Sequence, residues 1–276
     1  MKLVKALLVW AVSSIIMPLA LGAAFNALFT LWNVNADTAA RAPAWARLLY
    51  QWHGSIITLI SAGLLAALCA KLFHISITLP CRRNLLDGGL GFGLAIALIA
   101  LFTLTDSLRP ERGAHPSLGL LPLMLLTLLS ALAEELFTKA VIYDAIRERR
   151  GTLWATVAAA LAFFLIGGGL GGTVISGVNV MLLGVLCCLL YRRGGLWSPV
   201  LFRFGWGFTT VFLLGQGGGR HAVWQFYGVS ENLLTGGDAG FAYGLMWTLV
   251  LIVMIGGAIC SQLSIFNCQF TIKRKG

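Results

Sequence analysis

Long uninterrupted apolar blocks alternate with short polar or charged gaps along the whole chain. Several blocks reach the roughly 20 residues that an α-helix needs to cross a hydrocarbon core of about 30 Å. The blocks are continuously apolar, whereas the strands of a membrane β-barrel alternate between apolar and polar positions. Backbone amides in lipid must be paired within the protein, so these blocks predict helices. The predicted blocks cover residues 6–31, 54–73, 89–105, 118–146, 152–170, 175–191, 196–215 and 241–266.

The gaps between the blocks are short and carry turn or charge signals, so they leave no room for a soluble domain. Examples are the segments 79–83, 109–112 and 147–151, and we find no internal repeat. The first block is longer than the apolar core of a cleaved signal peptide, which favours a retained first span. The predicted fold class is therefore all-α: a single transmembrane domain over residues 1–276, built as a polytopic helix bundle of about eight spans.

Composition supports a membrane protein and gives no sign of a cofactor. Hydrophobic residues make up 58% of the chain and charged residues 11%, whereas soluble domains carry about 25% charged residues. The six cysteines lie inside or at the ends of the apolar blocks, without metal-ligand spacing to a histidine, which favours a role in packing. No glycine-rich segment has the spacing of a phosphate-binding loop. We expect the lipid bilayer as a partner, and no metal or cofactor.

The basic residues between the blocks indicate orientation, because cytoplasmic loops carry an excess of Lys and Arg. With the N-terminus inside, thirteen of them face the cytoplasm: Lys2, Lys5, Lys71, Arg82, Arg83, Arg147, Arg149, Arg150, Arg192, Arg193, Lys273, Arg274 and Lys275. Five face the other side: Arg41, Arg47, Arg109, Arg112 and Arg220. We therefore predict that both chain ends are cytoplasmic. Topology accounts for the net charge of +10, and we expect no nucleic-acid partner.

Four charged residues lie well inside the predicted spans, away from their ends: Glu134, Glu135 and Lys139 in the fourth, and Arg203 in the seventh. Such groups are expensive at membrane depth, about 2.5–3.5 kcal/mol each on insertion scales, and often mark functional sites. Glu135 and Lys139 are four residues apart and can pair on one helical face. Glu134 points elsewhere: it could serve unpaired as a general base or proton switch, or Arg203 could reach it from the seventh span. A structural cluster and a working site remain equally open.

Three sequence features, in order, resemble the CAAX-protease and bacteriocin-processing (CPBP/Abi) family of intramembrane peptidases. The first is the Glu134–Glu135 pair in a span that ends with residues 143–151, similar to the family's Glu-Glu-x-x-x-Arg motif. The second is the segment 184–199, which is similar to the helix–turn–helix that enters the family's last motif. The third is the segment 228–240, which resembles a loop frequent in bacterial members of the family. The resemblance covers about residues 131–245, and the family-like core would span about 118–266. It implies an integral protein of a bacterial cytoplasmic (inner) membrane.

The resemblance also implies a catalytic constellation, from which this chain departs. In the family the first Glu, here Glu134, activates water with the help of two His and an Asn or Asp, while the second Glu and the Arg support the site. Here Lys139 stands at the Arg position, which keeps the charge but loses the planar fork. Gly168 stands at the first His, Arg203 at the second His and Gly207 at the Asn. The histidines that the chain does contain lie at predicted span ends or in loops: His53, His74, His115 and His221.

These departures lead to one functional hypothesis and two alternatives. Glycine has no side chain to hold a water, and arginine cannot accept a proton near neutral pH. We therefore expect a degenerate, non-cleaving member of the family that binds a hydrophobic or lipidated peptide, or a membrane-protein partner, in a retained cavity. The first alternative is an active endopeptidase that depends on Glu134. The second is a proton-coupled transporter, in which the charged cluster and the glycine-interrupted spans form a path.

Overall fold

The computed structural model describes residues 2–35, 38, 41–105, 108–112, 120–166, 172–213, 224–228, 233–234, 236 and 243–273. Helices dominate these residues, and three of the longer helical segments contain a π-helical stretch (η1, η3 and η4). The elements are α1 (Lys2–Ala11), η1 (Val12–Ile16), α2 (Met17–Leu31), α3 (Ala44–Leu72), α4 (Arg82–Leu104), β1 (Leu108–Arg112), α5 (Leu120–Glu135), η3 (Leu136–Tyr143), α6 (Asp144–Arg150), α7 (Thr152–Ile166), α8 (Val174–Gly194), α9 (Trp197–Gly207), η4 (Phe208–Leu213), β2 (Trp224–Gly228) and α10 (Leu245–Lys273).

The predicted helical membrane protein is confirmed, since the described part of each apolar block lies mainly in a helical segment. Within the described residues, five helices are long and apolar enough to cross a bilayer: Val4–Leu31, Trp52–Leu72, Arg82–Leu104, Val174–Gly194 and Leu245–Gln262. Two helices begin earlier than their blocks, at Ala44 rather than 54 and at Arg82 rather than 89. Hydropathy marks only the part of a helix suited to lipid, whereas backbone hydrogen bonding continues into the polar flank.

A small antiparallel sheet departs from the all-α prediction. β1 pairs with β2, with Leu108 opposite Gly228 and Arg112 opposite Trp224. Sequence analysis treated both segments as loops, because each is short and its partner lies more than a hundred residues away along the chain. Pro110 is tolerated in β1 because both strands of a two-stranded sheet are edge strands. The sheet joins the loop after α4 to the loop after η4.

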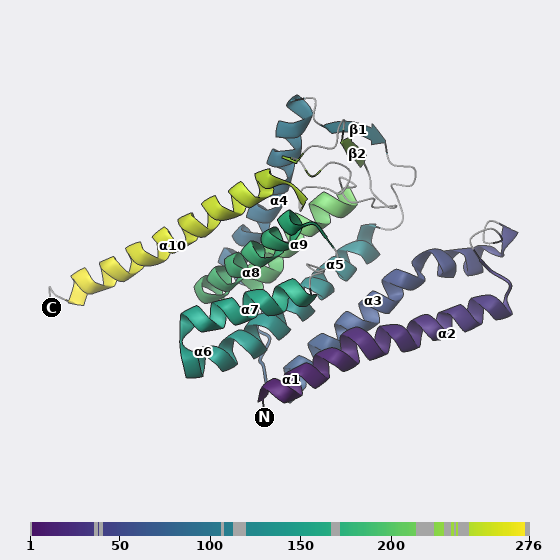
Figure 1. Cartoon of the computed structure of the whole chain (residues 1–276), viewed down its shortest axis with the longest axis horizontal. Helices are drawn as coiled ribbons and strands as arrows, with labels where there is room; N and C mark the ends of the chain where they lie inside the picture. The colour runs from purple at the N-terminus through teal and green to yellow at the C-terminus, as the bar shows by residue number, and fades with distance from the viewer. Residues whose placement is uncertain are drawn as a thin grey trace.

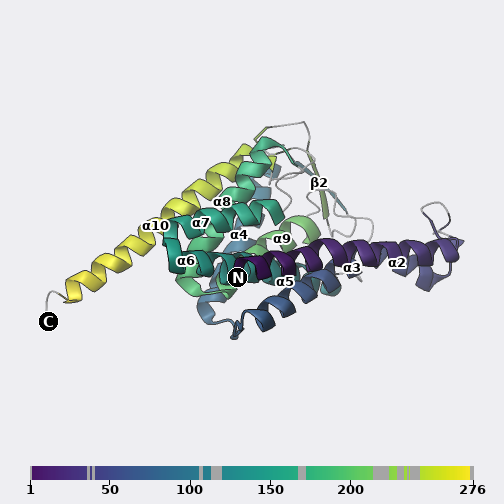
Figure 2. The ribbon, with the colours of Figure 1, turned by 60° about the horizontal axis from the view of Figure 1, so that its bottom comes forward.

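The helices form a central bundle with two outlying arms (Figure 1). α4, α5, α7, α8 and α9 lie at the centre, while α10 extends from one side and the α2–α3 hairpin from the other, as the rotated view also shows (Figure 2). One apolar cluster joins α1, α3 and η3, and another joins α4, α8, α9 and α10. Trp206 stacks on Trp247 with ring centroids 3.8 Å apart, which holds the start of α10 against α9. Cys187 and Cys188 are buried in α8 as free thiols.

α4 and α9 contact each other at the level of the backbone. A Cβ placed on Gly91 would lie only 2.2 Å from the carbonyl oxygen of Phe202, and one on Gly205 only 2.4 Å from the carbonyl oxygen of Gly88. Small residues at helix interfaces permit this close approach. The contact fixes the position of the turn of α9 that carries Arg203.

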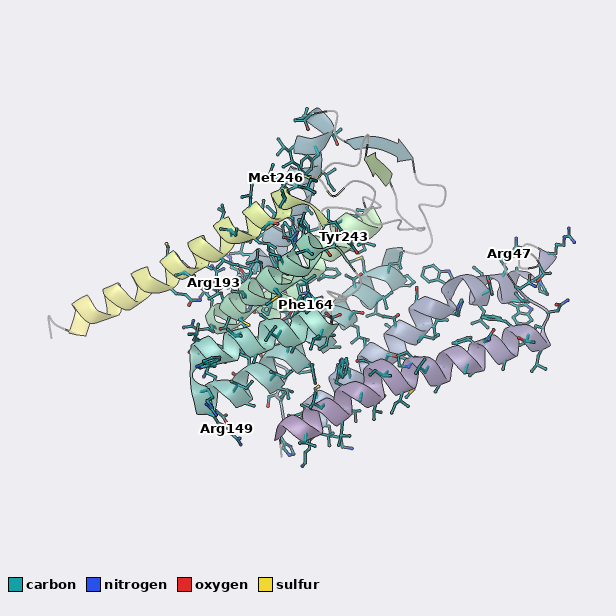
Figure 3. All side chains as sticks on the ribbon, in the orientation of Figure 1. Arg47, Arg149, Phe164, Arg193, Tyr243 and Met246 are labelled. Atoms are coloured by element: carbon teal, nitrogen blue, oxygen red, sulfur yellow. The ribbon has the colours of Figure 1, made fainter. Side chains whose placement is uncertain are left out.

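A polar network ties the start of α4 to the junction between α8 and α9. Asn84 donates to the Gly194 carbonyl at 2.8 Å and to the Ser198 hydroxyl at 3.0 Å. Ser198 donates in turn to Oδ2 of Asp87 at 2.6 Å, and Arg193 donates to Oδ1 of Asp87 at 2.5 Å. Asn84, Asp87 and Ser198 are buried, and Arg193 is marked in Figure 3. The network therefore anchors the first turn of α9, as the glycine contact anchors the middle of that helix.

Candidate functional site

The acid pair lies at the point where α5 widens into the π-helix η3. Glu134 and Glu135 are the last residues of α5, and η3 continues from Leu136 to Tyr143 without a break. The Thr138 hydroxyl donates to the Glu134 carbonyl at 2.7 Å, a local bond of the kind by which Thr side chains bend helices. π-helical turns are frequent at functional sites because they change the direction of nearby side chains.

Arg203 reaches both carboxylates from α9. Its Nη2 lies 2.7 Å from Oε2 of Glu134, and its Nη1 lies 3.3 Å from Oε1 of Glu135. Lys139 Nζ lies 3.3 Å from the other oxygen of Glu135, Oε2, in the i, i+4 pair expected from the sequence. That contact is an ion pair outside hydrogen-bond alignment, and Lys139 donates instead to the Thr138 hydroxyl at 3.1 Å. Two acids thus meet two bases, and the cluster is neutral overall.

The cluster is buried to different depths on its two sides. The side chains of Glu135 and Lys139 are fully buried, whereas Glu134 and Arg203 keep 23% and 18% of their surface exposed. Charges taken out of water are tolerated when they are paired with good geometry. Glu135 and Lys139 therefore form the enclosed half of the cluster, and Glu134 is the carboxylate that a ligand can reach.

The ring of Phe163, on α7, covers both cations. Its centroid lies 4.9 Å from Lys139 Nζ and 4.6 Å from Arg203 Cζ, in the range of cation–π contacts. The adjacent residue of α7, Phe164, is labelled in Figure 3. Sequence inspection had no signal to prefer Phe163, because neighbouring residues of an apolar helix differ only in the direction they face.

A cavity of about 230 Å³ opens on the side of Glu134. Its walls come from η1, α2, α3, α5 and α7, and its polar lining consists of Ser14, Thr58, Ser61, Ser130 and Glu134. These hydroxyl residues could not be recognised from the sequence. They are isolated in three separate apolar blocks, and only the packing of those helices brings them together.

The family-motif positions are only partly within the described residues. Arg203 is paired with Glu134, as described above. Gly207 lies one turn further along α9, and among the described residues a Cβ there would meet only Cγ2 of Thr127, at 3.7 Å, which is an ordinary contact. A side chain could therefore be accommodated at this position. Gly168 lies outside the described residues.

Neither of the described histidines, His53 and His74, lines the cavity beside Glu134. His53 packs its ring against Phe29 and Tyr50, and its Nδ1 lies 2.5 Å from the Tyr50 carbonyl. His74 occupies the turn after α3, with φ +53°. His115 and His221 lie outside the described residues. Among the residues that the structure describes, no group of three His, Cys, Asp or Glu side chains is arranged to hold a metal ion.

A comparison with protein families matches residues 115–209 to the type II CAAX prenyl endopeptidase Rce1-like family. The matched segment includes the acid pair, η3, α7, α8 and Arg203, and it ends before the loop 228–240 that sequence analysis also compared with the family. No curated protein and no solved structure matches the chain.

Proposed function

Residues 115–209 belong to the type II CAAX prenyl endopeptidase Rce1-like (CPBP/Abi) family, and from this premise we propose that the chain is a non-cleaving member. In this proposal it binds a hydrophobic or lipidated peptide, or a membrane-protein partner, in a cavity retained from its peptidase relatives. In this proposal Glu134 and Glu135 are the retained acid pair of the family, while Lys139 and Arg203 stand at substituted family positions and distinguish the chain from a working peptidase.

The observation that carries the proposal is the pairing of Arg203 with both carboxylates. A general base must be within hydrogen-bond reach of the water it activates and free to take its proton. Glu134 Oε2 instead accepts from Arg203 at 2.7 Å, and the guanidinium has no acceptor of its own. The group at the family's histidine position therefore occupies the base and cannot relay a proton.

The cavity beside Glu134 supports a binding role. Arg203, which pairs with Glu134, is not among the residues that line this cavity, and the wall combines apolar residues such as Leu65 and Ile166 with hydroxyl groups. Such a mixture of apolar surface and a few convergent polar groups is typical of ligand sites. A hydrophobic segment could place its side chains on the apolar part and its backbone polar groups on the hydroxyls.

One observation favours the second candidate function, an active Glu134-dependent endopeptidase. Glu134 lines the cavity and keeps 23% of its side chain exposed, so a water molecule could approach the oxygen that Arg203 does not hold. Cleavage would then require Arg203 to move away from the carboxylate.

A cleavage assay separates the two functions. Full-length protein in lipid vesicles would be incubated with a prenylated CAAX-type peptide and with an apolar helical peptide, and products would be detected by mass spectrometry. We expect the wild type and Glu134→Gln to give the same result, with both peptides intact, because the carboxylate is already engaged. An active family member serves as the positive control for the substrates. Hydrolysis by the wild type that Glu134→Gln abolishes would refute the non-cleaving assignment.

We also propose that eight helical segments cross the membrane, with both chain ends in the cytoplasm of a bacterial inner membrane. The long-range contacts support this arrangement. β1 and β2 follow the third and seventh segments and pair with each other, so both loops must lie on one side. Trp197, at the start of the seventh segment, donates to the carbonyl of Thr78, before the third, so the starts of these two segments also share a side. The basic loops place that second side in the cytoplasm.

Reporter fusions test this topology. A phosphatase that is active only outside the cytoplasm is expected to work when fused after Arg112, in the loop that follows the third segment. The same enzyme fused after the last residue should be inactive, whereas a green fluorescent protein at that end should fluoresce. The reverse pattern would invert the orientation, and equal activity at both sites would contradict an odd number of spans between them.

A further inference from the structure

We propose that the cavity beside Glu134 is a site for an uncharged stretch of peptide backbone with small side chains, recognised by the Ser61 hydroxyl and the free oxygen of Glu134. This inference rests on the proposed function, because it assigns to Glu134 the role of a hydrogen-bond acceptor held in place by Arg203. It adds the chemical class of the ligand and a recognition wall from α3, which lies outside the family-matched residues.

Ser61 provides the observation that points to a ligand. Its side chain is buried, with 9% of the residue exposed, and its Oγ finds no hydrogen-bond partner among the described residues. It lines the cavity together with Glu134. A buried hydroxyl without a partner costs the folded protein free energy, so the folded state without ligand is less stable than it could be. A ligand in the cavity would supply the missing bond.

The other polar groups of the cavity differ from Ser61 in their hydrogen bonds. Thr58 donates its hydroxyl to the Gly54 carbonyl at 3.0 Å, one turn back in α3, and keeps only acceptor capacity toward the cavity. Glu134 uses Oε2 for Arg203, which leaves Oε1 as an acceptor. Ser61 therefore supplies the donor and Glu134 the acceptor. A peptide unit, with one C=O and one N–H, complements this pair.

The first helical segment approaches the cavity through a proline-linked π-helical turn. Pro18 lies in the first turn of α2, directly after η1. Proline has no N–H and its ring crowds the carbonyl four residues earlier, so the helix deviates from regular α geometry at such positions. Ser14 from η1 and Pro18 both line the cavity. The local sequence of the first segment thus places a polar helical turn against the same cavity that Ser61 lines.

The net charge of the cluster and the volume of the cavity restrict the chemical class of the ligand further. The four charged residues of the cluster sum to zero, so a charged ligand would add an unbalanced charge at membrane depth, where charge is expensive. The cavity volume of about 230 Å³ corresponds to roughly eight water-sized groups at about 30 Å³ each. Two residues of glycine or alanine carry a similar number of non-hydrogen atoms, whereas two leucines exceed it. An uncharged segment rich in small residues fits best.

The test uses two synthetic apolar peptides of about 20 residues, with either Gly-Ala-Gly-Ala or four leucines at the centre and the same photoreactive diazirine residue beside it. Each is reconstituted with the full-length protein in lipid vesicles, irradiated, and scored for cross-link yield and position. We expect the small-centred peptide to cross-link at least fivefold more, at residues of α3 and α5. Equal yields for the two peptides would overturn the proposal.

Ser61→Ala tests the recognition group without changing the cavity shape. Loss of one hydrogen bond of ordinary strength should lower the cross-link yield of the small-centred peptide about fivefold, while the melting temperature of the ligand-free protein rises. Ser13→Ala is the matched control. Ser13 is also buried without a partner among the described residues, but it is not in the cavity lining. It should raise the melting temperature and leave the yield unchanged. A Ser61→Ala variant that binds like the wild type would overturn the proposal.

The same samples distinguish this inference from the proposed function. Mass spectrometry of the peptides reports cleavage independently of cross-linking. Glu134-dependent cleavage with selective cross-linking would refute the non-cleaving function and support the site. Intact peptides with unselective cross-linking would refute the site and leave the non-cleaving function standing.

Discussion

Replacing Arg203 with leucine is expected to destabilise the folded protein by about 3 to 5 kcal/mol, the usual cost of removing one partner from a buried ion pair. Among the described residues, Glu134 and Glu135 would then share only Lys139, which lies 3.3 Å from Glu135, and Glu134 would have no cation beside it. The leucine cannot offset an unpaired carboxylate. Unfolding in detergent, followed by tryptophan fluorescence against denaturant, measures the loss.

Two further variants show whether this loss comes from charge. Arg203→Leu combined with Glu134→Gln restores electrical neutrality and should recover a large part of the lost stability. Arg192→Leu is the control, because Arg192 is exposed at the end of α8, and its removal should change stability by less than about 0.5 kcal/mol. If Arg203→Leu and Arg192→Leu had equal effects, the cluster would not be contributing as an ion-paired unit.

Gly91→Ala is expected to destabilise the protein by about 3 kcal/mol, the upper end of the usual range for overpacking. The added methyl group would lie 2.2 Å from the carbonyl oxygen of Phe202, and backbone cannot rotate away as a side chain can. α9 would have to separate from α4, which would also move Arg203 relative to Glu134. Thermal unfolding in detergent gives the size of the effect.

Gly93→Ala is the matched control on the same helix. No heavy atom of the described residues lies within 4 Å of a Cβ placed on Gly93, and alanine favours a helix over glycine by about 1 kcal/mol. The two substitutions should therefore change stability in opposite directions. Destabilisation of similar size by both would show that the α4–α9 contact is less close than the structure indicates.

The helices and the partner of Glu135 follow from local sequence. Continuous apolar runs in lipid leave the backbone no alternative to helical pairing, so the positions of the helical segments could be predicted from hydropathy. The pair between Glu135 and Lys139 is also local, because residues four apart share a helical face. Arg203 could be named as a cross-helix partner for Glu134 on charge alone, although charge could not show that it reaches Glu135 as well.

Contacts between distant segments could not be predicted in this way. The β1–β2 sheet joins two loops with no pattern of their own, and its register depends on where α4 and η4 end. Phe163, rather than Phe164, covers the cations because of the rotation of α7 about its axis. The π-helical geometry of η3 depends on a small change in the backbone hydrogen-bonding pattern. Hydropathy carries no information about that change.

By itself, then, the sequence determined a basic, helical membrane protein with a family-like acid pair, an altered set of motif residues and enough charge to balance that pair. Each of these depends on residue type and on spacing along the chain. Tertiary structure alone decided that Arg203 pairs with both carboxylates, that Phe163 covers the cations, and that hydroxyl groups from three helical segments line one cavity beside Glu134. These contacts depend on how each helix is rotated about its axis and on close packing, such as that of Gly91 against Phe202. The rotation of a helix is fixed only in the assembled bundle.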